Sequence, residues 1–171
     1  ADGMLLGEIY DDNAWNTQHV DAGGLGLDTQ YHNNFKQAVR AAVFDAAFGS
    51  PNVGWLADVM DGTGAVAGTR AFNYFELHDE AWGLSGTQRS VKTIDPSFPH
   101  DDQFAKGRTK VANGLVLLAR GVPGILQGTE WLEDNEWEQQ KIDWSHKATY
   151  AGVFDYYKTL ISLRTSDPAL F

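Results

Sequence analysis

Three short apolar runs, each ended by a polar break, punctuate the chain at residues 4–9, 72–77 and 125–126. Runs of this length and composition predict short buried strands. Residues 27–35 are ambiguous between a fourth short strand and an irregular lead-in to the segment that follows.

Longer amphipathic segments separate these runs. Apolar side chains recur at helical spacing in residues 35–48, 103–120 and 150–165, and residues 51–60 are compatible with a shorter helix. Asn33 or Asn34 is a plausible N-cap for the first of them. Helices between successive strands supply the long crossovers that parallel strands need. The pattern therefore predicts an α/β fold with a parallel sheet.

Residues 83–102 form a long polar segment that exceeds a simple strand-to-helix connection and predicts a functional loop. It ends in His100-Asp101-Asp102, which could suggest a metal. No second, spaced set of ligands accompanies these residues, so we expect no metal site there.

Composition and net charge indicate which kinds of ligand or binding partner the protein favours. The chain has 171 residues, 43% of them hydrophobic, which suits one globular domain or part of one. The net charge of −10 disfavours a nucleic acid or an anionic membrane surface. Six Trp, six Tyr and nine Phe, several beside acids and amides, favour a neutral ligand such as a sugar.

Targeting and redox signals are sparse. No apolar run approaches the roughly 20 residues of a membrane helix, and the first residues lack a signal-peptide pattern. The absence of cysteine excludes disulfides and thiolate metal sites. We expect a soluble protein and favour a cytoplasmic location.

Charged side chains stand where two predicted strands end. Glu8 lies in the first run, and His78 and Asp79 follow the second. In barrels of parallel strands, catalytic side chains sit at the carboxyl ends of strands. A buried Glu8 would be either paired or functional, and desolvation would raise its pKa as a general acid requires. The alternative is a hydrated strand-end acid beside a hydrogen-bonded histidine.

Three motifs in this order, GEIYDDN (7–13), FELHDE (75–80) and GVPGILQGTEW (121–131), resemble the second half of the catalytic barrel of the α-amylase superfamily. These enzymes are retaining glycosidases and transglycosidases that act on α-glucans. The resemblance implies an α/β fold comprising strands five to eight of a (β/α)8 TIM barrel. Residues 1–171 would then be a partial catalytic barrel domain without strands one to four.

The resemblance also implies roles for individual residues. Glu8 matches the general acid/base, and Asp79 matches the catalytic aspartate that fixes sugar hydroxyls and favours the distorted transition state. His78 matches the histidine that binds the sugar at the cleavage point. Tyr10 matches an aromatic that often flanks the leaving-group subsite. Two tryptophans, Trp15 and Trp82, are candidate stacking surfaces, although Trp15 could instead cap the core.

Among family members, the chain looks most like glycogen-branching enzymes, because it contains HDE followed by G-x-E, Trp137 and Asp143-Trp144. The expected activity is thus 1,4-α-glucan branching, with an α-amylase-type or trehalose-releasing hydrolase as the alternative. A non-catalytic glucan-binding barrel, or an unrelated α/β domain with core aromatics and solvated acids, remain further alternatives.

One departure from the family matters for activity. The family's nucleophile is an aspartate at the end of the fourth strand, which this chain does not contain, and retaining glycosidases need two carboxyls about 5 Å apart. We therefore expect the chain to be part of a larger enzyme, completed by the amino-terminal half of the barrel in cis or as another chain, and to be inactive alone. The family's structural calcium is held largely by that missing half, so we expect no metal and no cofactor here.

Overall fold

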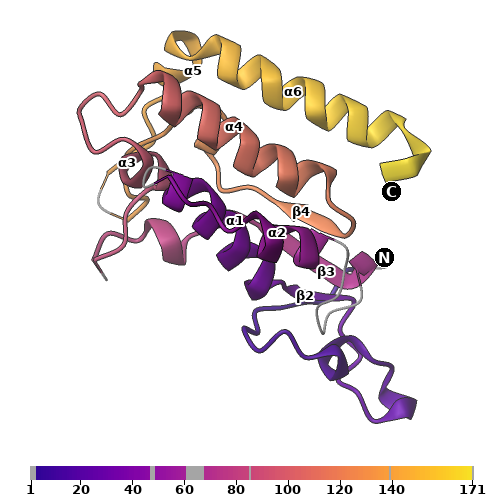
Figure 1. Cartoon of the computed structure of the whole chain (residues 1–171). Coiled ribbons are helices and arrows are strands. Elements are labelled where there is room, and N and C mark those ends of the chain that lie inside the picture. The colour runs from indigo at the N-terminus through magenta and orange to yellow at the C-terminus, as the bar shows by residue number, and fades with distance from the viewer. Residues whose placement is uncertain (1–2, 47–48, 61–67, 85, 139, 171) are drawn as a thin grey trace.

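Four strands form one parallel sheet in the computed structural model, which describes residues 3–46, 49–60, 68–84, 86–138 and 140–170 (Figure 1). The sheet order is β1-β2-β3-β4, so each strand lies beside its neighbour in sequence. Leu6 pairs with Thr29, Gln30 with Ala71, and Phe72 with Val122. The strands are β1 Leu6–Gly7, β2 Thr29–Tyr31, β3 Ala71–Tyr74 and β4 Val122–Gly124.

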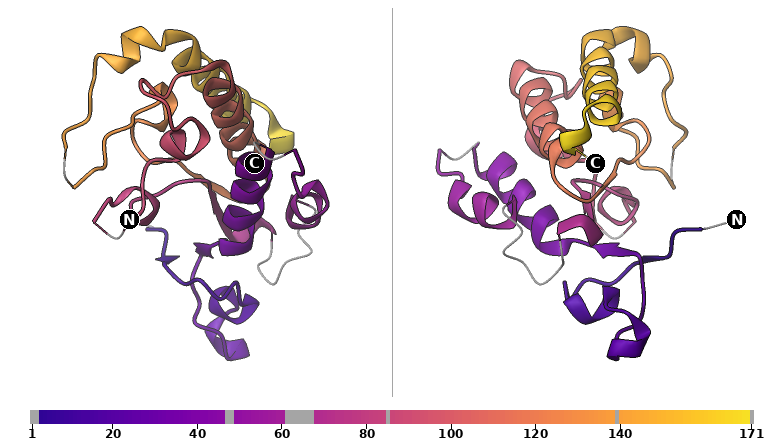
Figure 2. Two further views of the ribbon diagram at one scale, coloured as in Figure 1. Left: turned by 60° about the vertical axis from the view of Figure 1, so that its left-hand side comes forward. Right: turned by 90° about the vertical axis from the view of Figure 1, so that its right-hand side faces the viewer.

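α-Helices follow β2, β3 and β4 and pack together on one side of the sheet. Figure 1 shows α4 and α6 running side by side, with α1 and α2 next to them. The segment between β1 and β2 extends away from these helices in Figures 1 and 2. The α-helices are α1 Asn33–Asp45, α2 Val53–Met60, α3 Ser90–Ile94, α4 Gln103–Leu118, α5 His146–Thr149 and α6 Ala151–Ser166. The 3-10 turns are η1 Ala14–Thr17, η2 Val20–Ala22, η4 Gly68–Arg70, η5 Asp79–Ala81, η6 Thr129–Trp131 and η7 Pro168–Leu170.

The hydrophobic core lies mainly among these helices and includes Phe75 just beyond β3. Apolar residues of α1, α4 and α6 supply most of it. The periodicity correctly predicts the buried face of α1, but the predicted apolar face of α4 is wrong, because Phe104, Val111 and Leu118 are exposed and Ala112, Val116 and Leu117 are buried instead. Its buried members include Phe35, Val39, Val43, Phe75, Ala112, Val116, Leu132, Val153, Tyr157 and Leu160. Among the helices of the described residues, none is long and apolar enough to cross a membrane.

The ends of the strands differ from the ends of the apolar runs that predict them. Phe75 is fully buried in the helix-facing core beyond the end of β3, and Ile125 packs against the same core beyond β4. The expected strand at residues 125–126 is therefore wrong, because β4 precedes it and includes Pro123. Proline is tolerated there because β4 is an edge strand of the described sheet. The ambiguous run at 27–35 contains β2.

The start of α1 differs from its predicted cap. Neither asparagine is the cap, because α1 begins at Asn33 itself and His32 before it makes no side-chain capping bond. Instead, the buried carboxylate of Asp12 accepts from Asn33 N at 2.8 Å and from Asn34 N at 2.6 Å. A residue that follows β1 thus satisfies the free amides of the helix that follows β2. The predicted end of this helix at residues 47–48 lies outside the described residues.

The polar segment at residues 83–102 is not a loop throughout, because it contains α3. Most of its length is nevertheless irregular, and it connects η5 to α4. It therefore lies on the carboxyl side of β3.

Candidate active site

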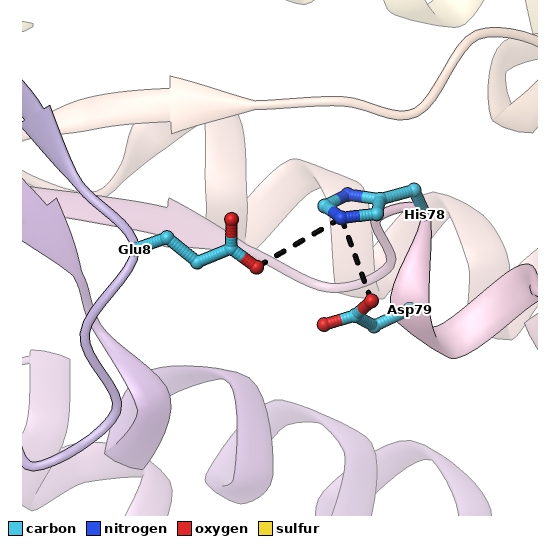
Figure 3. Close-up of side chains that lie close together, drawn as sticks. All are labelled: Glu8, His78 and Asp79. Atoms are coloured by element: carbon cyan, nitrogen blue, oxygen red, sulfur yellow. Dashed lines mark ion pairs between the residues drawn. The ribbon is translucent and has the colours of Figure 1, made fainter.

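Glu8, His78 and Asp79 lie together at the carboxyl edge of the sheet, and we call them the acid–histidine cluster. Glu8 directly follows β1, whereas His78 and Asp79 lie just beyond β3, where η5 begins. His78 Nε2 is 3.8 Å from Glu8 Oε1 and 3.4 Å from Asp79 Oδ1. Figure 3 shows the two carboxylates converging on the same imidazole nitrogen. Parallel strands bring these residues together because their carboxyl ends share one edge.

The cluster is open to solvent. The side chains of Glu8, His78 and Asp79 are 49%, 46% and 50% exposed. The sequence argument for Glu8 assumed a buried carboxyl, and this burial is absent because Glu8 lies beyond the last paired residue of β1. A ligand can therefore reach all three side chains.

Tyr10 bridges the two acids of the cluster. Its hydroxyl lies 2.9 Å from Glu8 Oε1 and 2.7 Å from Asp79 Oδ2. A phenol has one proton, so it donates to one carboxylate at a time. Burial of the hydroxyl and its hydrogen bonds to Asp79 and Glu8 raise the pKa of Tyr10 well above its usual value. Tyr10 is therefore a neutral hydrogen-bond donor at physiological pH.

An aromatic layer holds the Tyr10 ring in place. The ring packs edge-on against Tyr31 with centroids 5.8 Å apart, and Tyr31 stacks on Phe72 at 5.4 Å. Lys36 Nζ lies 5.7 Å from the centre of the Tyr10 ring and forms a 2.8 Å ion pair with Glu80. The position of the hydroxyl between the acids is thus fixed by residues of β2, β3 and α1.

A buried ion pair that the sequence interpretation missed supports the loops of the site. Arg89 Nη1 is 2.8 Å from Glu76 Oε1, and these side chains are 1% and 3% exposed. Ser90 N and Thr129 Oγ1 also donate to the Glu76 carboxylate. Arg89 further donates to the carbonyl of Gln127 at 2.8 Å. Glu76 therefore connects the end of β3 to α3 and η6.

Trp137 also contacts the cluster, although the sequence indicates it only as part of a family motif. Its Nε1–H donates to the His78 carbonyl oxygen at 2.8 Å, and the two rings lie edge to face at 6.3 Å. No local pattern around Trp137 signals this contact, because His78 is 59 residues away in the chain.

The other two candidate tryptophans lie differently. Trp82 caps η5, the turn that Asp79 begins, and is 37% exposed. Trp15 is 45% exposed, and its indole N–H donates to the Gly23 carbonyl within the segment between β1 and β2. Among the described residues, no hydrogen bond or ring contact connects Trp15 to the acid–histidine cluster. Their stacking roles therefore stay predictions.

Two groups of described residues place three metal-capable side chains within 4.8 Å of one another: the acid–histidine cluster, and Glu133 with Asp134 and His146. In the cluster, the Tyr10 hydroxyl already contacts both carboxylates. In the second group, both Glu133 oxygens accept backbone amides.

Comparison with known proteins finds similarity to pullulanases. No family model matches the chain. Pullulanase of Bacillus subtilis (strain 168) is 26% identical over 166 residues, which cover 90% of this chain and 20% of the relative. The chain thus spans about a fifth of the length of this relative.

Solved structures give the same picture. Pullulanase from Bacillus acidopullulyticus is 26% identical, with a TM-score of 0.65 over 86% of this chain and 20% of that one. Pullulanase of Anoxybacillus sp. LM18-11 complexed with maltotetraose has a TM-score of 0.68 at 20% identity, covering 98% and 27%. Cyclic alpha-maltosyl-(1-->6)-maltose hydrolase of Arthrobacter globiformis has a TM-score of 0.67 at 16% identity, covering 96% and 34%.

These relatives support the resemblance to the α-amylase superfamily, and the fold is similar to parts of its enzymes. They are pullulanases and a maltosyl-maltose hydrolase, so they do not confirm the resemblance to glycogen-branching enzymes. In sequence and in fold, the chain is similar to a part of α-amylase-family glycoside hydrolases.

Proposed function

We propose that this chain is the acid-bearing part of a retaining α-glucan hydrolase. The observation that carries the proposal is the convergence of Glu8, Tyr10, His78 and Asp79 at the carboxyl edge of a parallel sheet. The 26% identity to pullulanase supports the same class of substrate.

In this mechanism, Glu8 is the proton donor. It protonates the glycosidic oxygen as the bond to the anomeric carbon breaks, while a carboxylate from outside this chain attacks that carbon. The ionised Glu8 then takes a proton from water, which displaces the enzyme carboxylate and releases the sugar. Exposure of Glu8 suits this role because the leaving oxygen must reach its carboxyl group.

Asp79 and His78 bind the sugar at the cleavage point, and Asp79 is not the nucleophile. It shares the Tyr10 hydroxyl with Glu8, which keeps both carboxyls on the same side of the cluster. A nucleophile must attack the anomeric carbon from the face opposite the departing oxygen. Asp79 is better placed to accept hydrogen bonds from sugar hydroxyls.

The four strands are proposed to be strands five to eight of a (β/α)8 barrel. Their parallel, sequential order supports this assignment, and so does the lack of an outer partner for β1 and β4 among the residues described. In a closed barrel, these two edges would pair with the first and fourth strands of the amino-terminal half. That half would also bring the nucleophile, so the chain alone should not turn over glucan.

Hydrolysis is proposed in preference to branching because the matched relatives are named as pullulanases and a hydrolase. The two reactions differ in whether water or a glucan hydroxyl resolves the intermediate. Counting new reducing ends against new branch points in one reaction separates them.

The test is Glu8→Gln in the full-length protein that contains this chain, with maltotetraose and pullulan as substrates. Loss of a general acid/base should lower kcat by about 10²–10⁴-fold. Asp155→Asn is the matched control, because this acid is 69% exposed on α6, and its kcat should equal that of the wild type. An active Glu8→Gln enzyme would refute the catalytic role. Binding of maltotetraose by the wild type without turnover would favour a non-catalytic glucan-binding barrel.

A further inference from the structure

Trp137 combines an exposed ring with a fixed position. The residue is 45% exposed, yet its indole N–H is bound to the His78 carbonyl oxygen at 2.8 Å. This bond fixes one edge of the indole, and the edge-to-face contact with the His78 imidazole restricts its tilt. The ring therefore stands beside the acid–histidine cluster without having to be ordered when a ligand arrives.

A buried carboxylate closes the loop that carries Trp137, residues 134–143, which is described except for residue 139. Glu133 is 1% exposed, and its two oxygens accept from Asn135 N at 2.9 Å and from Asp143 N at 2.7 Å. Asn135 Nδ2 also donates across the loop to the Lys141 carbonyl at 2.9 Å. One side chain thus holds both ends of the loop together.

Residues from the preceding loop and α3 attach this loop to the rest of the fold. Arg89 Nε donates to the Asn135 carbonyl at 3.0 Å, and Lys92 Nζ forms a 2.7 Å ion pair with Glu136. Both contacts are largely shielded from solvent, since the side chains of Arg89 and Lys92 are 1% and 23% exposed. These contacts brace the loop on the amino-terminal side of Trp137, and the bonds to Lys141 and Asp143 brace it on the carboxyl-terminal side.

We infer that Trp137 is a sugar-contacting residue next to His78, whose exposed ring stacks on a glucose unit of an α-glucan. A pyranose presents apolar C–H groups on its faces, and a rigid indole offers a large apolar surface at little entropic cost. The sugar bound there adjoins the one at the acid–histidine cluster, because Trp137 and His78 are in ring contact. This inference rests on the proposed function and adds a residue that determines affinity for the glucan chain.

The experiment measures binding of maltotetraose to the full-length protein by calorimetry, for the wild type, Trp137→Ala and Trp137→Phe, each carrying Glu8→Gln so that the sugar is not hydrolysed during the titration. We expect the Kd to rise about tenfold or more in Trp137→Ala. It should stay within about threefold of wild type in Trp137→Phe, which keeps an aromatic face but loses the N–H. Trp144→Ala is the matched control, because Trp144 is 57% exposed and its ring packs on Trp131 and not on His78, and the Kd of this variant should not change.

Each other outcome has one meaning. Equal affinity of Trp137→Ala and wild type would refute the inference and leave the proposed function standing. Equal losses in the Phe and Ala variants would show that Trp137 acts through its bond to the His78 carbonyl and not by stacking. A wild-type protein that binds no maltotetraose would refute the α-glucan function itself, and the inference with it.

Discussion

Replacing Arg89 with leucine should destabilise the protein strongly, because it leaves a buried carboxylate without its cation. At the observed 2.8 Å, the attraction between Arg89 and Glu76 is about 6 kcal/mol for an effective dielectric constant of about 20. Desolvation of the two charges offsets most of this, so the pair itself contributes little net stability. Removing only Arg89 restores none of the hydration that Glu76 loses on folding.

The expected cost of Arg89→Leu is about 3–5 kcal/mol. The substitution also leaves the carbonyls of Gln127 and Asn135 without their donor. Against a typical unfolding free energy of about 5–15 kcal/mol, this is a large fraction. Urea-induced unfolding followed by tryptophan fluorescence measures it as a shift of the midpoint.

A double-mutant cycle assigns the cost to the pair. Adding Glu76→Gln to the Arg89→Leu variant removes the unpaired charge and keeps an acceptor for Ser90 N. The double variant should therefore lose less stability than the sum of the losses of the two single variants. Lys158→Ala breaks an exposed ion pair on α6 and serves as the control, with a midpoint close to that of the wild type. A loss below about 1 kcal/mol for Arg89→Leu, or no coupling in the cycle, would refute the reasoning.

Three further predictions concern the elements around the site. Asp12→Ala should cost about 1–2 kcal/mol, because the amides of Asn33 and Asn34 lose their acceptor, and the urea midpoint of the variant checks this. The hydroxyl of Tyr74 is buried and has no hydrogen-bond partner in the described structure, so Tyr74→Phe should unfold at an equal or higher urea concentration. Burial raises the pKa of both Tyr74 and Tyr10 in the folded chain. Above a pH of about 10, the unfolded chain therefore releases protons that the folded chain retains, which favours unfolding. The melting temperature should consequently fall between a pH of about 9 and about 11. A melting temperature that stays constant over this range would contradict the raised pKa values.

The sequence predicts which segments are buried better than it predicts where strands end. Apolar runs correctly indicate β1 and β3, but Phe75 continues the second run beyond β3, and Ile125 lies in a third run that follows β4 without belonging to it. Phe75 is buried and Ile125 is partly buried in a core that the helices dominate, and burial against a helix or against a sheet leaves the same apolar signature. Pairing depends on where the neighbouring strand stops, which a local pattern does not contain.

The sequence likewise predicts some residues of the candidate site and misses the contacts of others. Glu8, His78 and Asp79 are predictable, because each stands where a predicted strand ends and parallel strands bring such positions to one edge. The sequence assigns Tyr10 to a sugar subsite, whereas the structure places its hydroxyl between Glu8, two positions away in the chain, and Asp79, 69 positions away. Trp137 reaches His78 only because of the way in which its long loop runs, and the course of that loop depends on contacts with distant segments of the chain.

The one-sided pairing of β1 and β4 has a consequence for amide hydrogen exchange. In the described sheet, β2 and β3 each have a strand on both sides, whereas β1 and β4 have one. Protection against exchange should therefore be highest in the two central strands and lower in the outer ones when the chain is isolated. If a larger protein closes this sheet into a barrel, Leu6 and Val122 should exchange as slowly as Gln30 and Phe72. Their exchange rates would thus report, without any substrate, whether the sheet is complete.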